Sequence, residues 1–317
     1  MITIEDVERA ARTIAGRVHR TPIRRSATLS MELGAEALLK AELFQRTGSF
    51  KVRGALNRIE ELTGEERRRG VISISAGNHA QAVAWAAREA GIDALIVMWQ
   101  GADEAKVAAT RGYGAEVDQE VADPKEAFAR LDELLAETGR TLVHPFDDAA
   151  VMAGQGTVGL EILEDRAVPD VVVVPVGGGG LVSGIATAVK ARQPAARVIA
   201  VEPERSTALH DALAAGHSVP VVPRSAADAL NAPFAGENCV QICRELGVES
   251  VLVSEDDLAV AFRWLYARMK YAAELGATAA AAALLSGKVQ VEPGQTVVAV
   301  VSGGNIAPKQ AAAILAS

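Results

Sequence analysis

Strand-like apolar runs alternate with helical patterns along most of this chain, and no other sequence feature restricts the fold as strongly. The runs that resemble strands are residues 71–75, 94–98, 171–176, 197–203 and 297–302. All but the fourth lead into a helical pattern rich in small residues. Such alternation is typical of parallel strands connected by crossover helices. The sequence therefore predicts an α/β fold of doubly wound, mainly parallel sheets.

A length of 317 residues favours about two domains. We expect residues 69–147 to form a small domain, and residues 1–68 together with 148–317 to form a large one. The stretch HPFDDAAVMAGQGTVG, residues 144–159, is the best candidate for a crossing between them. Half of the residues are hydrophobic but only 4% are aromatic, which suits buried parallel strands covered by small-residue helices.

Charge and apolar patterning exclude several classes of partner. The net charge is -8, and the basic cluster at residues 67–69 resembles the solvated end of a helix, so nucleic acid is not an expected partner. Residues 1–16 mix acids and bases and carry a Thr3 and Asp6 capping pattern, which predicts a surface helix and not a signal peptide. No apolar run reaches the ~20 residues of a membrane span. We therefore expect a cytoplasmic protein without a membrane partner.

The cysteines and histidines show no metal-binding or redox spacing. Cys239 and Cys243 are four residues apart, so both should lie on one helical face as packing residues. The histidines form no pair with ligand spacing and a third ligand nearby; they are His19, His79, His144, His210 and His217. No metal centre is expected.

Three of the expected strands end in glycine-rich turns, within residues 73–82, 174–184 and 300–308. Ligands of open α/β sheets bind beyond the carboxyl ends of strands, where such turns lie. Four consecutive glycines, Gly177 to Gly180, would present several backbone N–H groups beside the positive end of a helix dipole. The turn at 177–180 therefore predicts a phosphate site, although a merely tight turn is the simpler alternative.

Two cofactors remain open at this point. Gly178 and Gly180 follow a strand, and Glu202 ends the next strand 22 residues later, close to the ~20 residues of a dinucleotide fingerprint. The third glycine, Gly184, comes one position late for that motif. NAD also leaves unexplained why Lys51 stands at the start of a predicted helix, where the dipole and burial would lower the pKa of an amine. A nucleophilic lysine together with a phosphate site indicates pyridoxal 5'-phosphate (PLP).

The motifs GSFKVRGA, SAGNHAQA, PVGGGG and SGGN occur in this order between residues 48 and 305. In this combination the chain resembles the PLP-dependent β-eliminating enzymes of fold type II, most of all the serine/threonine dehydratases, which are relatives of serine racemase. The resemblance extends from about His19 to the end of the chain. It implies the tryptophan synthase β-like fold with PLP in the cleft between the domains, a homo-oligomer, and an amino acid as substrate. The implied reaction converts L-threonine or L-serine into a 2-oxo acid and ammonia.

The resemblance also implies a role for each matching residue. Lys51 would bond covalently to the cofactor, Phe50 would pack beside its ring, and Ser302 would face the pyridine nitrogen. The remaining cofactor contacts would be Asn78 to the ring hydroxyl and Gly177, Gly178, Gly179, Gly180 and Leu181 to the phosphate. The substrate carboxylate would be held by Ser75, Asn78 and His79.

Some positions depart from the family pattern. Ala229 replaces a usual glycine near the cofactor, which would narrow the pocket, and Leu275 replaces the proline that usually follows the acid at 274. The divalent-cation site of some relatives matches at Glu202 but not at Ala208, so no metal is assigned. Ala76 stands where serine racemases of the family have a second serine. A serine racemase and a hydroxyaspartate dehydratase remain open as alternatives within the family.

Overall fold

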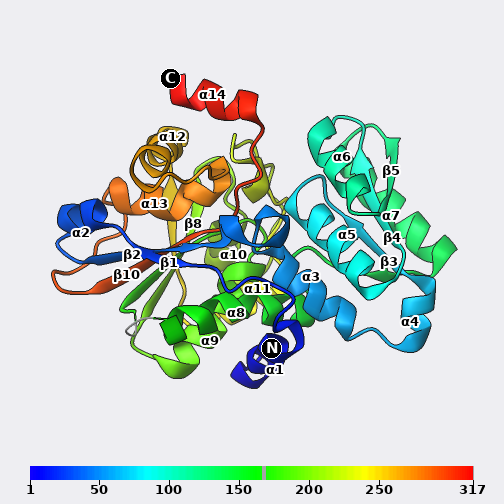
Figure 1. Cartoon of the computed structure of the whole chain (residues 1–317), viewed down its shortest axis with the longest axis horizontal. Helices are drawn as coiled ribbons and strands as arrows, with labels where there is room; N and C mark the ends of the chain where they lie inside the picture. The colour runs from blue at the N-terminus through cyan, green and yellow to red at the C-terminus, as the bar shows by residue number, and fades with distance from the viewer. Residues whose placement is uncertain (166–168, 317) are drawn as a thin grey trace.

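The computed structural model describes residues 1–165 and 169–316 and contains two separate β-sheets (Figure 1). Within these residues one sheet has the order β1-β2-β10-β7-β8-β9 and the other the order β5-β4-β3-β6. The strands are β1 (Ile23–Arg25), β2 (Glu36–Ala41), β3 (Val71–Ile74), β4 (Ala94–Trp99), β5 (Glu116–Val121), β6 (Thr141–Leu142), β7 (Val171–Pro175), β8 (Arg197–Pro203), β9 (Glu249–Val253) and β10 (Thr296–Val301).

Every pair of neighbouring strands is parallel except β1 with β2, within the residues described. The helices are α1 (Ile4–Ile14), α2 (Ala27–Leu33), α3 (Lys51–Glu60), α4 (Gly64–Arg69), α5 (Asn78–Ala90), α6 (Glu104–Gly112), α7 (Pro124–Thr138), α8 (Ala149–Asp165), α9 (Gly180–Arg192), α10 (Ala208–Ala215), α11 (Glu237–Glu245), α12 (Glu255–Trp264), α13 (Ala279–Leu285) and α14 (Pro308–Ala316). The expected α/β fold with mainly parallel sheets is confirmed.

The valine run of β7 shows why these strands are apolar at every position. Val171 and Val173 pack into one core with residues of α12 and α13, whereas Val172 and Val174 pack into another with residues of α8, α9 and α11. Figure 1 shows α12 and α13 on one side of this sheet and α8 and α9 on the other. A parallel strand with helices on both faces has no solvent-facing side, so alternation of apolar and polar residues is lost.

The two sheets are built from different parts of the chain. All strands of the four-stranded sheet lie between residues 71 and 142, and those of the six-stranded sheet lie before and after them. Only residues 143–148 cross from β6 to α8, and the rest of the stretch 144–159 belongs to helix α8. The crossing is therefore shorter than the sequence indicated. The domain boundaries at 68 and 148 remain a prediction.

Helix α3 packs against both α8 and α5 and lies between the two sheets (Figure 1). A Cβ on Gly154 would lie 2.6 Å from the Cα of Gly54, so the backbones of α8 and α3 are in direct contact. This close approach requires glycine on both helices. Helix α3 therefore has little freedom to slide along α8.

Local expectations for several surface elements are confirmed. The Thr3 side chain accepts a hydrogen bond from the backbone N–H of Asp6, and the Asp6 carboxylate accepts one from the N–H of Thr3, which caps α1. Cys239 and Cys243 are free thiols buried along one side of α11. None of the described helices is both long and apolar enough to span a lipid bilayer.

Candidate active site

The glycine-rich turns that follow β7 and β10 lie at the same edge of the six-stranded sheet, because these two strands are parallel neighbours. The loop after β2 reaches this edge as well. Ser49 forms an isolated β-bridge with Gly303, and the backbone N–H of Phe50 donates to the Ser302 carbonyl at 3.1 Å. These contacts place the first residue of α3, Lys51, beside the turn that follows β10.

Lys51 is held as the sequence predicted, in the first turn of α3. Its Nζ donates a hydrogen bond to the Pro145 carbonyl at 2.7 Å. Burial lowers the pKa of the Lys51 ammonium to about 8, although the nearby Cys239 and Glu274 raise it. A substantial fraction of the amine is therefore neutral near physiological pH, as a nucleophile or a base requires.

Asn78 begins helix α5 and ties the two sheets together at this site. Its Nδ2 donates to Glu274 Oε1 at 2.6 Å, and its Oδ1 accepts from Asn305 Nδ2 at 2.8 Å. Asn305 Nδ2 also donates to the Thr47 carbonyl at 2.7 Å. The turn after β3 and the turn after β10, far apart in the sequence, are thus joined by side-chain amides.

Glu274 is a buried carboxyl group at the centre of these contacts. Burial raises the pKa of Glu274 to about 7, while the hydrogen bond from Asn78 lowers it. A Cβ on Gly303 would lie 2.1 Å from Glu274 Oε1. Gly303, the first glycine of the SGGN turn, is therefore needed to leave room for this carboxyl group.

His79 is buried, and its imidazole is neutral. Its Nε2 lies 2.9 Å from the Val143 carbonyl, which can only accept, so Nε2 carries the proton. Burial, followed by the charge of Lys51, lowers the pKa of His79 to about 3. An anion at the start of α5 would thus meet the backbone N–H of His79 and not a cationic ring. Ser75 lies in the same turn, and its Oγ accepts from the N–H of Gly77 at 3.2 Å.

In the glycine turn that leads into α9, Gly178, Gly179 and Gly180 leave no room for a side chain. Gly179 has a φ of 98°, in the left-handed region, and a Cβ there would lie 2.8 Å from the Cβ of Cys239. A Cβ on Gly178 would lie 2.3 Å from the Phe146 ring, and one on Gly180 would lie 2.8 Å from the Phe146 carbonyl. The first N–H groups of α9, including that of Leu181, have no acceptor within the helix. This turn fits a bound phosphate group.

Glu202, the acid at the position of the candidate cation ligand, accepts two backbone hydrogen bonds. Its Oε1 accepts from the N–H of Leu209 at 2.8 Å and its Oε2 from the N–H of His210 at 2.7 Å. The carboxyl group therefore caps the start of α10. Among the described residues there is no group of three His, Cys, Asp or Glu side chains that could hold a metal ion.

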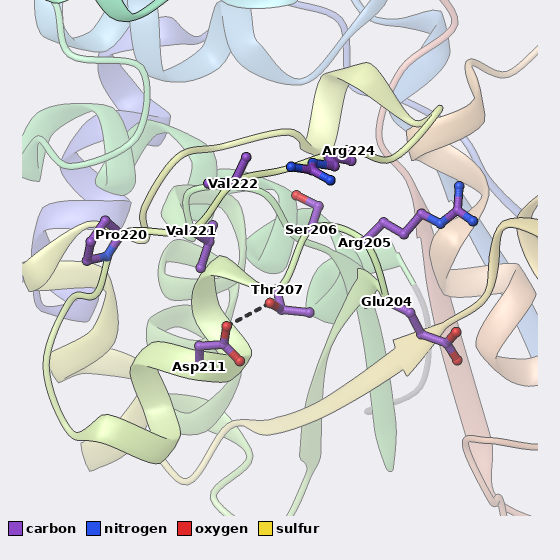
Figure 2. Close-up of a pocket in the computed structure, with 9 residues that line it drawn as sticks. All are labelled: Glu204, Arg205, Ser206, Thr207, Asp211, Pro220, Val221, Val222 and Arg224. Atoms are coloured by element: carbon purple, nitrogen blue, oxygen red, sulfur yellow. Dashed lines mark hydrogen bonds between the residues drawn. The ribbon is translucent and has the colours of Figure 1, made fainter.

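The surface also carries a hollow of about 680 Å³ that is separate from these residues. Figure 2 shows its lining, which comes from α10 and the segments on either side of it and includes both acids and arginines. None of the predicted site residues lines it.

Sequence reasoning missed Pro145, Phe146 and Asn305 as site residues. Pro145 and Phe146 lie in the stretch that was interpreted only as a crossing, and Asn305 is the last residue of the SGGN motif. The Lys106–Asp228 ion pair, at 2.5 Å, was not predicted either. It joins α6 to the loop that carries Ala229.

Similarity to known proteins identifies the family of this chain. The family described as "Pyridoxal-phosphate dependent enzyme" matches residues 14–303. The L-threonine ammonia-lyase of Thermotoga maritima is 44% identical over 307 residues, which cover 96% of this chain and 76% of that protein. The catabolic L-threonine dehydratase TdcB of Escherichia coli is 42% identical, with 96% and 93% covered. The structure of maize serine racemase superimposes with a TM-score of 0.93 at 34% identity, covering 97% of this chain and 95% of that one.

Proposed function

Because the chain belongs to the family of pyridoxal-phosphate dependent enzymes, we propose that it converts L-threonine, L-serine or a related β-hydroxy amino acid into a 2-oxo acid and ammonia. The observation that supports this most is the buried amine of Lys51 beside the glycine turn at 177–180. The family membership decides between the two cofactors that the sequence left open, in favour of PLP. Threonine and serine are the substrates in the names of the relatives.

The residues present fit this cofactor. Residues 177–180 with the N–H of Leu181 would hold its phosphate at the start of α9. Phe50 would pack beside the ring, and Asn78 and Ser302 would meet the ring hydroxyl and the pyridine nitrogen. When bound, PLP supplies an electron-withdrawing group for the substrate α-carbon. Ser302 is uncharged, so it does not enforce a protonated pyridine as a carboxylate would.

Proton transfer in this proposal is assigned to Lys51. An amine with a pKa of about 8 can accept the α-proton near neutral pH and return a proton later. The substrate carboxylate would lie at the start of α5, on the side chains of Ser75 and Asn78 and the backbone N–H of His79. Helix N-termini favour anions there without a cationic side chain.

Colour and product release test the proposal together. The purified chain with PLP should be yellow, should be bleached by borohydride, and should release 2-oxo acid from L-threonine or L-serine. A panel of β-hydroxy amino acids that includes hydroxyaspartate and phenylserine would define the preferred substrate. A colourless protein that releases no 2-oxo acid from any member of the panel would contradict the proposal.

We expect elimination with little or no racemisation, because of Ala76. Racemisation needs an acid or base on each face of the α-carbon, and Lys51 can serve only one face. Ala76, which packs against the core formed with α5, has a methyl group that cannot donate a proton. Chiral analysis of L-serine reaction mixtures should show far less D-serine than pyruvate, and Ala76→Ser should raise the D-serine fraction. Formation of D-serine as fast as pyruvate by the unaltered protein would show that another group serves the second face.

We also propose that the protein works as a homo-oligomer in the cytoplasm. The proposal rests on the family resemblance; Met31, Phe44 and Tyr266, which each expose at least 48% of their surface, are apolar side chains that a subunit interface could cover. Analytical ultracentrifugation of the purified chain would give the oligomer size. A monomer at micromolar concentration would contradict this part of the proposal.

A further inference from the structure

Arg53 lies two residues after Lys51 in the first turn of α3, and its side chain is fully buried. At ~100° per residue, side chains two positions apart leave a helix on nearly opposite sides. The contacts agree, since Lys51 reaches Pro145 in the crossing whereas Arg53 reaches Glu42 and Glu161. One side of this turn therefore faces the candidate active site, and the other faces a buried network of charges.

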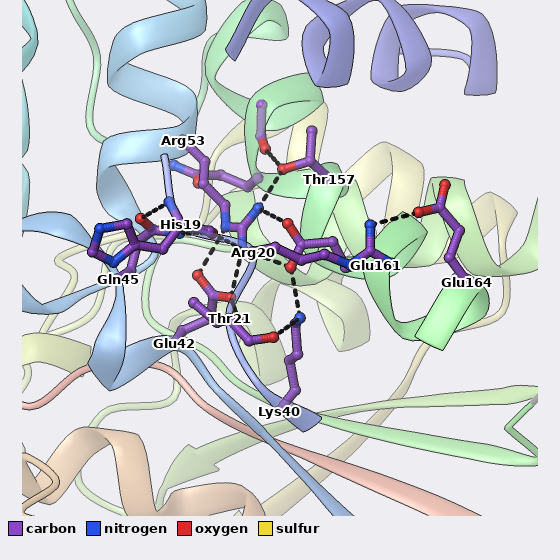
Figure 3. A network of polar contacts seen from close by, with 12 residues as sticks. His19, Arg20, Thr21, Lys40, Glu42, Gln45, Arg53, Thr157, Glu161 and Glu164 are labelled. Carbon is purple, nitrogen blue, oxygen red and sulfur yellow. Dashed lines mark hydrogen bonds and ion pairs between the residues drawn. The ribbon is translucent and has the colours of Figure 1, made fainter. Parts of the chain in front are cut away.

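Figure 3 shows this network around the Arg53 guanidinium. Arg53 Nε and Nη2 donate to the two carboxylate oxygens of Glu42, each at 2.8 Å. Its Nη1 and Nη2 donate to Glu161 at 2.7 and 3.0 Å, and Nη1 also donates to Thr157 Oγ1 at 3.2 Å. Glu42 and Glu161 thus each engage one edge of the planar guanidinium through two N–H groups, a geometry that lysine cannot reproduce.

The partners of Arg53 come from different elements. Glu42 follows strand β2, Glu161 and Thr157 belong to α8, and Lys40 of β2 donates to Glu161 Oε2 at 2.6 Å. Buried ion pairs are often no more stabilising than apolar packing of the same volume, and in some proteins they serve to define one geometry. Here the geometry defined is the position of the first turn of α3 relative to β2 and α8.

We propose that Arg53 is a positioning residue, which fixes the first turn of α3 and thereby holds the Lys51 amine at the Pro145 carbonyl. This inference rests on the proposed role of Lys51. Arg53 itself touches neither substrate nor cofactor. The direct backbone contact between Gly54 and Gly154 prevents sliding of α3, and the two carboxylates prevent its rotation.

The test measures the reactivity of Lys51 itself, in the full chain before PLP is added. A limiting amount of an amine-reactive acylating reagent is added at a series of pH values, and the extent of acylation of each lysine is measured by mass spectrometry. The exposed Lys309 serves as the internal reference. In the unaltered protein, acylation of Lys51 should be half-maximal near pH 8, and this pH is called the Lys51 midpoint. The groups close enough to influence Lys51 are Glu274, His79, His144 and Cys239, and the substitutions below leave all of them in place.

Arg53→Lys keeps the positive charge and removes the paired N–H donors that bind Glu42 and Glu161. We expect the Lys51 midpoint to rise by about one pH unit or more, toward the ordinary lysine value, as the amine leaves its buried position. With PLP and substrate present, kcat should fall at least tenfold while KM changes less. Glu42→Gln weakens the paired hydrogen bonds between Arg53 and Glu42 and should shift the Lys51 midpoint in the same direction. It replaces Arg53→Lys in the test if that variant does not fold.

Lys40→Met is the matched control, because it removes a fully buried charge from the same network but has its partners, Thr21, Glu161 and Asp165, outside α3. It should lower Tm and leave the Lys51 midpoint unchanged to within about 0.3 of a pH unit. An unchanged midpoint in both Arg53→Lys and Glu42→Gln, or an equal shift in Lys40→Met, would overturn the inference. Failure of the proposed function is distinguishable, because the unaltered protein would then form no yellow complex with PLP while its Lys51 midpoint could still be measured.

Discussion

Replacing Lys51 with alanine is expected to abolish 2-oxo acid release while the protein stays folded. The lysine is assigned two tasks, covalent attachment of the cofactor and transfer of the α-proton. A positioned acid or base alone contributes about 10²–10⁴-fold to a rate, so loss of both tasks should cost at least about 10⁴-fold. Lys51→Ala removes the buried amine but no apolar core side chain, so the core and the backbone of the first turn of α3 should stay intact.

The measurement combines activity with absorbance. Lys51→Ala should still bind PLP reversibly through the phosphate turn, but borohydride should no longer fix the cofactor to the protein. Lys309→Ala, a change on the exposed face of α14, is the control and should behave as the unaltered enzyme. Turnover of Lys51→Ala within about tenfold of the unaltered enzyme would contradict the assignment of the lysine.

The position of Lys51 could be predicted because its causes are local. The helical spacing after residue 50 and the apolar run before it are both readable in the sequence, and the structure begins α3 at Lys51. The glycine turn at 177–180 was equally readable, since four glycines after a valine run have few other uses. Its packing was not readable, because Phe146 and Cys239, which exclude a Cβ there, are distant in the sequence.

Long-range pairing explains most of what the sequence did not indicate. The contact of Asn78 with Glu274 spans almost 200 residues (|i−j| = 196), and no local pattern reports such a pair. The buried charges around Arg53 were hidden for the same reason, since Lys40 in an apolar strand looks solvent-facing until its partner on α8 is known. Strand β5, EVDQEV, was missed because it lies at a sheet edge and is partly exposed, so its polar residues hide the strand pattern.

The glycine at position 178 provides the second large expected effect. In Gly178→Ala the new methyl group would lie 2.3 Å from the Cγ and Cδ1 atoms of Phe146, a ring fixed by edge contacts with His144 and Phe234. The turn must move, because the ring is not the free end of a flexible side chain. Overpacking of this kind costs about 1–3 kcal/mol, and part of that cost falls on the phosphate site.

We therefore expect Gly178→Ala to bind PLP more weakly, by up to roughly 100-fold, since each 1.4 kcal/mol corresponds to about tenfold in affinity. Gly112→Ala, where a Cβ would meet nothing within 4 Å, is the matched control and should leave PLP affinity unchanged. The mechanism can be tested separately by adding Phe146→Ala, which removes the ring that the new methyl group would strike. If the clash is the cause, the double variant should bind PLP more tightly than Gly178→Ala alone, even though Phe146→Ala by itself leaves a cavity. If the double variant binds no better, the glycine is required for the approach of the phosphate itself and not for its packing against the crossing.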